Sequence, residues 1–210
     1  LQMKITKFVH SWLLVEQGGK TVLFDPGNYS YDEKVFDYTQ LETLDYLIIT
    51  HEHQDHFYLP FVKEIIGALS PVKVVAPESV VGQLKVEGIT ATSKGDEIVS
   101  IEHADHEKLL NFPIPENLSV SIFDTLTHPG DSLSFHQSKR VLALPIQAPW
   151  GSMVASCEKA IAVRPEIVIP IHDWHWNDRA RDGLYKMAKN YFEQKNIRFV
   201  EPEIGQSIEI

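Results

Sequence analysis

The chain contains a single cysteine, Cys157, so it cannot form an internal disulfide. This cysteine falls in a predicted helix over residues 152–164, where buried packing is its expected role. No apolar run approaches the ~18 residues that a membrane-spanning helix needs. The N-terminal stretch also lacks the apolar core of a signal peptide. We therefore expect a cytoplasmic protein without a membrane partner.

Basic residues are scarce as well. The 19 Lys and Arg residues are outnumbered by 29 Asp and Glu residues, which gives a formal net charge of −10. This charge disfavours a broad electrostatic contact with nucleic acid or anionic lipid, so we expect no nucleic-acid partner. The length of 210 residues fits one domain, predicted over residues 1–210. The sequence carries no information on oligomeric state.

Apolar periodicity and turn residues predict an α/β fold. The first half contains meander-like strands, and buried strands then alternate with helices in two halves. This order predicts a four-layer αββα sandwich, with two mixed β-sheets face to face and helices outside. Strands are predicted over residues 4–9, 12–16, 21–24, 45–50, 72–76, 89–92, 97–103, 118–123, 141–145, 166–171, 198–200 and 207–210. Helices are predicted over residues 61–69, 77–86, 152–164 and 178–194, with a further short helix within 33–44.

The most informative segment is His-Glu-His-Gln-Asp-His at residues 51–56, directly after an apolar strand. It offers four potential metal ligands, namely His51, His53, Asp55 and His56. Imidazole and carboxylate are ligands that zinc prefers, and manganese and iron also accept them. A loop can turn all four side chains toward one place. A solvated turn has no need for such a set, so the segment predicts a metal site.

Further His and Asp residues follow other predicted strands. His103 and His106 follow the strand over residues 97–103, Asp131 follows the segment that begins at residue 125, and His172 ends the strand over 166–171. Catalytic groups of α/β proteins gather at the carboxyl ends of strands. We therefore expect these side chains to share one site with residues 51–56.

This pattern resembles the metallo-β-lactamase fold superfamily across nearly the whole chain. His10-Ser11 and Asp25-Pro26 further resemble the branch that contains L-ascorbate-6-phosphate lactonase. The resemblance implies two divalent metal ions, most simply zinc, and the following ligands: His51, His53 and His103 for one ion, Asp55, His56 and His172 for the other, and Asp131 for both. Seven ligands and a shared hydroxide would complete two four- or five-coordinate ions.

Several nearby residues have two open interpretations. His103 is preferred to His106 as a ligand because it directly follows the apolar strand, and His106 then lies at the rim. His128 is interpreted as a histidine that supports the ligands. Asp25 either caps its strand or fixes the tautomer of a ligand histidine. His10 is either a core residue or a pocket wall, and Trp150 is a candidate substrate-facing wall.

These residues predict a hydrolase that acts on a small-molecule ester, lactone or phosphoester with a metal-activated hydroxide. Asp55 is the predicted proton carrier. A phosphodiesterase or nuclease of the same fold is the first alternative, and it would need basic residues at the site. Arg179 and Arg181 are the nearest pair, interpreted as solvated helix positions. A diiron redox protein and a non-catalytic metal-binding protein are the remaining alternatives.

Overall fold

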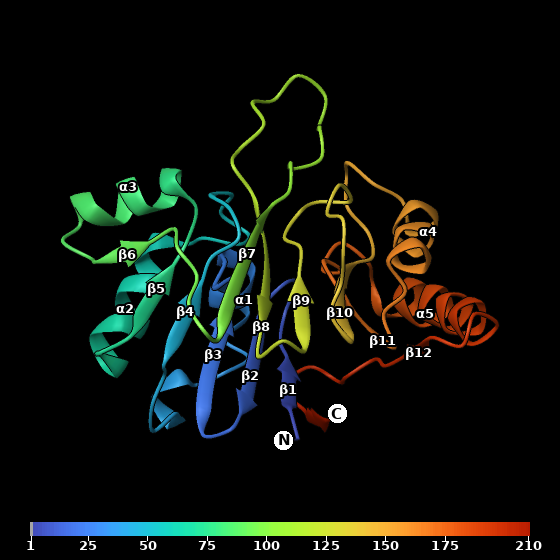
Figure 1. Cartoon of the computed structure of the whole chain (residues 1–210), viewed down its shortest axis with the longest axis horizontal. Coiled ribbons are helices and arrows are strands. Elements are labelled where there is room, and N and C mark those ends of the chain that lie inside the picture. Colours follow the sequence, from blue (N-terminus) through green and yellow to red (C-terminus); the bar gives the residue numbers. More distant parts are fainter. Residues whose placement is uncertain (1) are drawn as a thin grey trace. The chain divides into compact units, whose positions relative to one another are not determined.

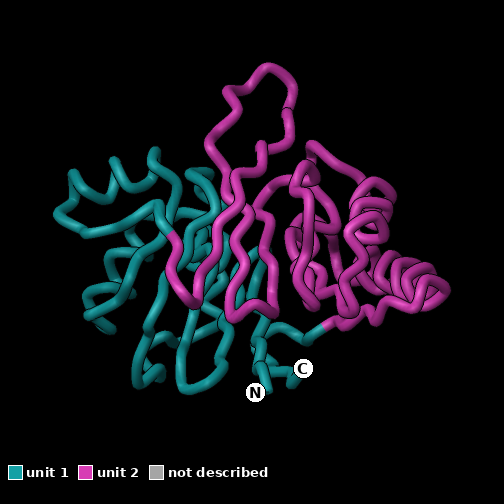
Figure 2. Tube along the Cα trace, viewed as in Figure 1, with its two compact units in different colours: residues 1–94, 202–210 teal, residues 95–201 magenta. Residues whose placement is uncertain are grey.

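A computed structural model describes residues 2–210, which form two compact units (Figure 2). Unit 1 comprises the residues up to Lys94 together with Pro202–Ile210, and unit 2 comprises Gly95–Glu201. Each unit has its own mixed sheet, helices and apolar core. The single domain over residues 1–210 stays a prediction.

Unit 1 is built on a seven-stranded sheet in the order β13-β1-β2-β3-β4-β5-β6 (Figure 1). Its strands are β1 (Lys4–Lys7), β2 (Leu13–Gln17), β3 (Lys20–Phe24), β4 (Tyr46–Ile48), β5 (Lys73–Val75), β6 (Ala91–Thr92) and β13 (Ser207–Glu209). Its helices are α1 (Asn28–Glu33), the 3-10 turn η1 (Tyr38–Gln40), α2 (Leu59–Leu69) and α3 (Glu78–Val86). The strands β1 to β3 and β13 pair antiparallel, and β3 to β6 pair parallel.

Local sequence explains these elements. Gly18 and Gly19 join β2 to β3 with φ values of 60° and 75°, a left-handed conformation that glycine adopts at no steric cost. Helix α2 carries its buried residues Phe61, Val62 and Ile65 on one face. This face packs into the same core cluster as Trp12, which lies at the end of the turn after β1.

Unit 2 is built on a six-stranded sheet in the order β12-β11-β10-β9-β8-β7. Its strands are β7 (Val99–His103), β8 (Leu118–Ile122), β9 (Leu126–His128), β10 (Val141–Pro145), β11 (Ile167–Ile171) and β12 (Arg198–Phe199). Its helices are α4 (Met153–Val163) and α5 (Asp178–Glu193), which lie side by side in Figure 1 and contact each other. The pairs β7–β8 and β8–β9 are antiparallel, and β9 to β12 pair parallel.

The core of unit 2 lies between this sheet and the two helices. Strands β10 and β11 are buried at every position, as expected of parallel strands covered by helices. Cys157 of α4 and Phe192 of α5 belong to the same apolar cluster as Leu142 of β10. Both helices begin at a side-chain cap, where Ser152 accepts from the amide of Ala155 and Asn177 accepts from that of Ala180.

The predicted α/β class, with two mixed sheets and helices, is confirmed. The short helix predicted within residues 33–44 is the 3-10 helix η1, whereas α1 at Asn28–Glu33 was not predicted. Helix α1 has six residues and no side-chain cap, so its sequence gives no clear start signal. Among the helices of residues 2–210, none combines the length and the apolar character needed to cross a bilayer.

Candidate metal centre

The carboxyl ends of three strands of unit 1 meet at one edge of its sheet. Strand β2 pairs antiparallel with both β1 and β3, so β1 and β3 run in the same direction, and β4 runs parallel to β3. His10 follows β1, Asp25 follows β3 and the loop of residues 51–56 follows β4. The polar residues of this edge therefore come together as the sequence predicts for its part of the site.

The 51–56 loop folds back on itself. The carbonyl oxygen of His53 accepts hydrogen bonds from the amides of His56 at 2.9 Å and Phe57 at 2.7 Å. This turn brings the ring of His51 within 4.1 Å of the ring of His56 and within 4.8 Å of the ring of His53, measured between centroids. Three imidazoles thus lie side by side, with His51 and His56 fully buried.

Asp25 fixes the tautomer of the ring next to it. Its Oδ2 lies 2.7 Å from Nδ1 of His56, and because a carboxylate accepts, this nitrogen carries the proton. Thr50 donates its amide to Oδ1 and its hydroxyl to Oδ2 of Asp25, both at 2.8 Å. The Thr50 hydroxyl oxygen then accepts from Nδ1 of His51 at 3.1 Å. In both histidines Nε2 is left as the basic atom, which is the state a metal ligand requires.

His10 orients the carboxylate of Asp55. Nε2 of His10 lies 3.1 Å from Oδ2 of Asp55, and the ring itself is buried, whereas the Asp55 side chain is 22% exposed. The ring of Tyr29, on α1, contacts His10 edge-on at 5.2 Å between centroids. Burial, together with the negative charge of Asp55, raises the pKa of Tyr29 above its usual value of 10.0. Tyr29 therefore stays a protonated donor at neutral pH, a neighbour of Asp55 that the sequence analysis did not identify.

A close approach of two backbones holds this loop in place. A Cβ atom on Gly27 would lie 1.8 Å from the carbonyl oxygen of Asp55, so only glycine fits there. On either side, the amide of Asn28 donates to the carbonyl of Gln54 at 2.8 Å and the amide of Tyr58 donates to that of Pro26 at 3.1 Å. The Asp25-Pro26-Gly27 segment thus positions the 51–56 loop through its backbone.

Unit 2 gathers a second set of candidate ligands at the carboxyl ends of its parallel strands. Strand β8 is antiparallel to β7 and β9, so β7, β9, β10 and β11 all end at one sheet edge. His106, Asp131 and His172 follow β7, β9 and β11 and are at most 4% exposed. Nε2 of His172 lies 3.1 Å from Oδ2 of Asp131, and Nε2 of His106 lies 3.6 Å from the same oxygen.

Backbone carbonyls orient both rings. Nδ1 of His172 donates to the carbonyl of Gln147 and Nδ1 of His106 to that of Glu107, each at 2.6 Å. Since Nδ1 carries the proton in each ring, the basic Nε2 atoms face Asp131. Burying two basic nitrogens beside a carboxylate is unfavourable unless protons or a cation neutralise them. The donor set of unit 2 therefore fits a divalent metal ion.

Two further residues support Asp131. The indole Nε1 of Trp150 donates to Oδ2 at 3.0 Å. The buried Asn117 accepts from the amide of Asp131 at 3.1 Å and donates to the carbonyls of Ala104 and Pro129. The sequence analysis missed Asn117, because a lone asparagine at the start of a strand has no metal-type signal.

The geometry favours His106 over His103 as a candidate ligand, which is the reverse of the preference drawn from the sequence. The His103 side chain is 66% exposed and lies 3.4 Å from the exposed Asp105. His103 is the last residue of β7 and pairs with Leu118 of β8. The residue that approaches Asp131 is His106, three positions farther along the chain. His128 is fully buried, and its Nδ1 accepts from the amide of Gly130 at 3.2 Å, so it supports the turn before Asp131.

Backbone strain coincides with the site. His10, Asp25 and His172 have φ values of 64°, 48° and 63°, a left-handed conformation that costs energy in residues other than glycine. Each is fixed by the contacts described above. Such strain persists where the surrounding structure overdetermines a conformation, and it concentrates at functional sites.

Each unit by itself contains closely spaced ligand atoms. In unit 1, His10, Asp55 and His56 offer atoms within 4.8 Å of one another, and His51 and His53 offer another such pair. In unit 2, His106 and Asp131 do the same. The oxygen and nitrogen atoms available suit zinc, manganese or iron.

Comparisons with known proteins agree with this chemistry. Residues 4–172 match the family model described as "Beta-lactamase superfamily domain". The chain is 31% identical over 186 residues to Protein Rv0786c of Mycobacterium tuberculosis, which covers 81% of this chain and 84% of that protein. It is 28% identical over 198 residues to a UPF0173 metal-dependent hydrolase of Salinibacter ruber, covering 81% and 84%.

A solved structure shows the same fold. The metallo hydrolase Igni18 of Ignicoccus hospitalis superposes with a TM-score of 0.74 at 20% identity. The superposition covers 100% of this chain and 99% of that one.

Proposed function

Because the chain belongs to the beta-lactamase superfamily, we propose that it is a metal-dependent hydrolase that cleaves a small ester, lactone or phosphoester. The observation that carries the proposal is the fixed orientation of the imidazoles. Asp25 and two backbone carbonyls hold the Nδ1 atoms of His56, His172 and His106 as donors. Their Nε2 atoms therefore carry the lone pair and can act as metal ligands.

We propose that the ligand sets of both units act on the same two divalent ions, with zinc the simplest choice. Relative to the sequence analysis, His106 replaces His103. The assignment is His51, His53 and His106 for one ion, Asp55, His56 and His172 for the other, and Asp131 for both. The support for joining the two sets is the family membership and the count of seven ligands.

When bound, two such ions would lower the pKa of a shared water toward ~7 and supply hydroxide at neutral pH. The residues of the chain provide orientation and proton transfer. Asp55 is the proton carrier that we propose, because it is the partly exposed carboxylate of its loop and His10 fixes its Oδ2. Tyr29 adds a protonated hydroxyl near Asp55 that can donate to a substrate oxygen.

A phosphodiesterase or nuclease is the alternative, and the arginines of α5 argue against it. Arg181 lies 3.2 Å from Asp173 through Nε and 2.9 Å from Asp178 through Nη1. Arg179 is exposed on the same helix. A phosphodiester substrate would need cations that are available to bind it. A carboxylic ester or lactone needs none, so within the proposed substrate classes we favour these two over a phosphoester.

The proposal is tested by measuring metal content and hydrolysis together. Purified protein is analysed for bound metals and is then assayed against lactones, aryl esters and bis-phosphodiesters, before and after dialysis against a strong chelator. We expect loss of turnover on chelation and recovery with zinc or manganese. Turnover that survives complete metal removal would exclude the mechanism.

Variants test whether the two sets of ligands act together. His53→Ala removes a ligand of unit 1, and His106→Ala removes one of unit 2. If both bind the same ion, each variant loses that ion and the double variant loses no more. Independent sites would instead give additive losses of metal. His103→Ala is the matched control, and we expect it to keep its metal content and activity, with all circular-dichroism spectra unchanged.

A further inference from the structure

The loop between β7 and β8 carries an apolar tip. It spans residues 104–117 and extends beyond the carboxyl edge of the unit 2 sheet (Figure 1). Leu110, Phe112 and Ile114 are 74%, 64% and 56% exposed. Three large apolar side chains are thus exposed within five residues of this loop. A single exposed apolar residue is ordinary, but a cluster of this kind marks a binding surface.

The tip is also held in shape. Pro113 and Pro115 each fix a φ angle, and the amide of Phe112 closes a turn on the carbonyl of Leu109 at 3.1 Å. Leu110 has a φ of 50°, which is uncommon for a residue other than glycine. A shaped loop loses less entropy on binding than a flexible one, so it is suited to receive a ligand.

The base of the loop is joined directly to the proposed bridging ligand. The amide of Glu107 donates to the carbonyl of Asp131 at 2.8 Å, and Oε1 of Glu107 accepts from the amide of Leu133 at 2.9 Å. At the other end, Asn117 bonds both Ala104 and Asp131. His106, within the same loop, approaches Asp131. The loop that carries the apolar tip is therefore anchored at its base to the proposed ligand set.

We propose that Leu110, Phe112 and Ile114 form the apolar wall that receives the acyl or aryl group of the substrate. This inference rests on the proposed function and narrows its substrate class to esters or lactones that bear an apolar substituent. The occupant is substrate and not a protein partner, because the loop that bears the wall also supplies His106 and is bonded to Asp131 at its base. The three side chains determine specificity, and the ligands below them perform the chemistry.

The test compares substrates of increasing alkyl length. Zinc-loaded protein is assayed with p-nitrophenyl esters that have acyl chains of two to ten carbons, and with γ-lactones of four to ten carbons. Each methylene buried against the wall contributes up to about a fourfold gain in kcat/KM. The variant Leu110→Ser/Phe112→Ser/Ile114→Ser should flatten this rise, so that its deficit relative to the natural protein grows with chain length. The loss should appear mainly in KM, because the wall binds ground state and transition state alike.

A matched control removes exposed apolar surface elsewhere in the same unit. Val154 on α4 and Met187 on α5 are 61% and 60% exposed, and Val154→Ser/Met187→Ser should keep the natural dependence on chain length. If kcat/KM rises with chain length equally steeply in the loop variant and the natural protein, the proposal is overturned. The proposal would also be overturned if the loop substitutions changed the oligomeric state, or the binding to phosphatidylcholine vesicles, and left the dependence of kcat/KM on chain length unchanged.

A second measurement separates this inference from the proposed function. Acetate, hexanoate and decanoate, the carboxylate products of such esters, are titrated calorimetrically into the zinc-loaded protein and the loop variant. Affinity that rises with chain length only when the wall is intact supports the wall, even if no ester is turned over. Equal affinities in both proteins would overturn it, even if hydrolysis is observed.

Discussion

The indole nitrogen of Trp150 donates a hydrogen bond to Oδ2 of Asp131 at 3.0 Å. The same oxygen lies 3.1 Å from Nε2 of His172. The sequence suggested Trp150 as a substrate wall, and the structure gives it a second role, because it fixes the carboxylate that we propose as the bridging ligand. A supporting hydrogen bond of this kind sets both the orientation and the basicity of a metal ligand.

Trp150→Phe should therefore weaken metal binding. The phenyl ring keeps most of the apolar contact and removes the donor, so we expect a 10- to 100-fold loss in metal affinity or kcat, the usual range for such partners. Affinity is measured by competition with a zinc chelator. Trp176→Phe, a partly buried residue packed against the unit 2 core, is the control. A change in KM alone, with unchanged zinc affinity, would assign Trp150 to the substrate wall instead.

Asp25→Asn should reverse the tautomer of His56. An amide nitrogen in the place of Oδ2 donates toward Nδ1 and moves the ring proton to Nε2, which then cannot bind metal. If the side-chain amide is instead rotated by 180°, its NH₂ group faces the backbone amide of Thr50, and two donors then meet without an acceptor. We expect a 10- to 100-fold loss of metal affinity. NMR of the ring nitrogens, with ¹⁵N-labelled histidine, reports the tautomer directly.

Asp45→Asn is the control for this substitution. Asp45 also accepts from a neighbouring backbone amide, that of Thr21 at 2.9 Å, but it lies outside the ligand groups. Although partial burial opposes it, bonds from Lys20 and Thr21 lower the pKa of Asp45. Its contribution to stability is present above the unfolded pKa of about 4 and is lost as the pH falls below it. Equal metal loss in both variants would show that Asp25 acts only on folding.

The sequence alone points to the 51–56 loop as a candidate site because all the information for it is local. His51, His53, Asp55 and His56 lie within six positions behind a periodic apolar strand, so neither a distant contact nor a loop conformation had to be known. Long periodic elements were predicted for the same reason. Helix α2, predicted over residues 61–69, spans Leu59–Leu69 in the structure.

The choice between His103 and His106 depended on information that the sequence does not contain. A strand end favoured His103, but the loop after β7 turns at its base, where Asn117 and Glu107 bond across to the Asp131 segment. These contacts join residues far apart in the chain. No local pattern encodes them, and the same holds for the neighbourhood of Tyr29 and Asp55.

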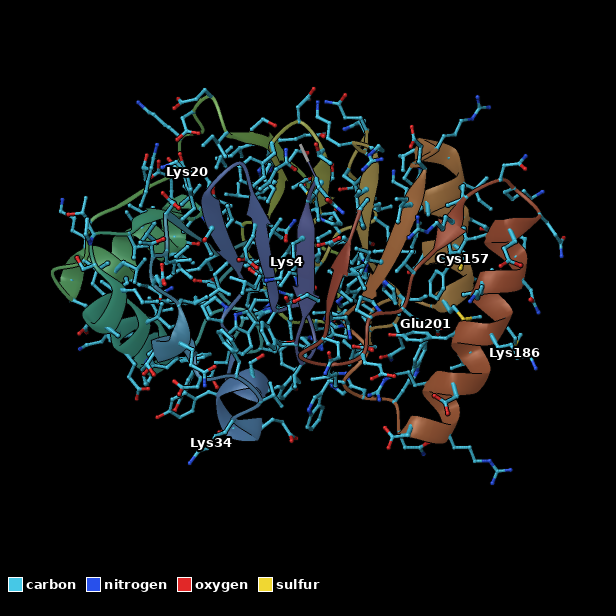
Figure 3. The ribbon with its side chains drawn as sticks, turned by 90° about the horizontal axis from the view of Figure 1, so that it is seen from below. Lys4, Lys20, Lys34, Cys157, Lys186 and Glu201 are labelled. Atoms are coloured by element: carbon cyan, nitrogen blue, oxygen red, sulfur yellow. The ribbon has the colours of Figure 1, made fainter. Side chains whose placement is uncertain are left out.

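Cys157 should be unreactive in the folded protein. It lies on α4 beside α5 (Figure 3) and is 4% exposed. Burial, with a smaller effect of Glu158, raises the pKa of its thiol to about 11. A disulfide reagent at pH 8 should therefore react slowly, and rapidly once urea unfolds the chain. Since this is the only cysteine, every modification reports this site. Immediate stoichiometric reaction of the folded protein would contradict its burial.

The buried Tyr185 should make stability depend on alkaline pH. Its hydroxyl donates to Asp173, the residue after His172. Burial and the negative charge of Asp173 raise the tyrosine pKa well above 10.0. The folded state thus holds the neutral phenol, while the unfolded state releases its proton near pH 10. The stabilisation is complete below that pH and is lost as the pH rises from there through the higher pKa of the folded state.

Tyr185→Phe removes this titration together with one hydrogen bond. At pH 7 we expect the free energy of unfolding to fall by about 1–3 kcal/mol, the cost of leaving a buried acceptor without its donor. Between pH 9 and 11 the variant should lose less stability than the natural protein, as measured by urea unfolding. Tyr191→Phe on the same helix is the control, because Tyr191 is 39% exposed. If both variants show the natural slope, the Tyr185–Asp173 bond does not hold α5 to the His172 loop.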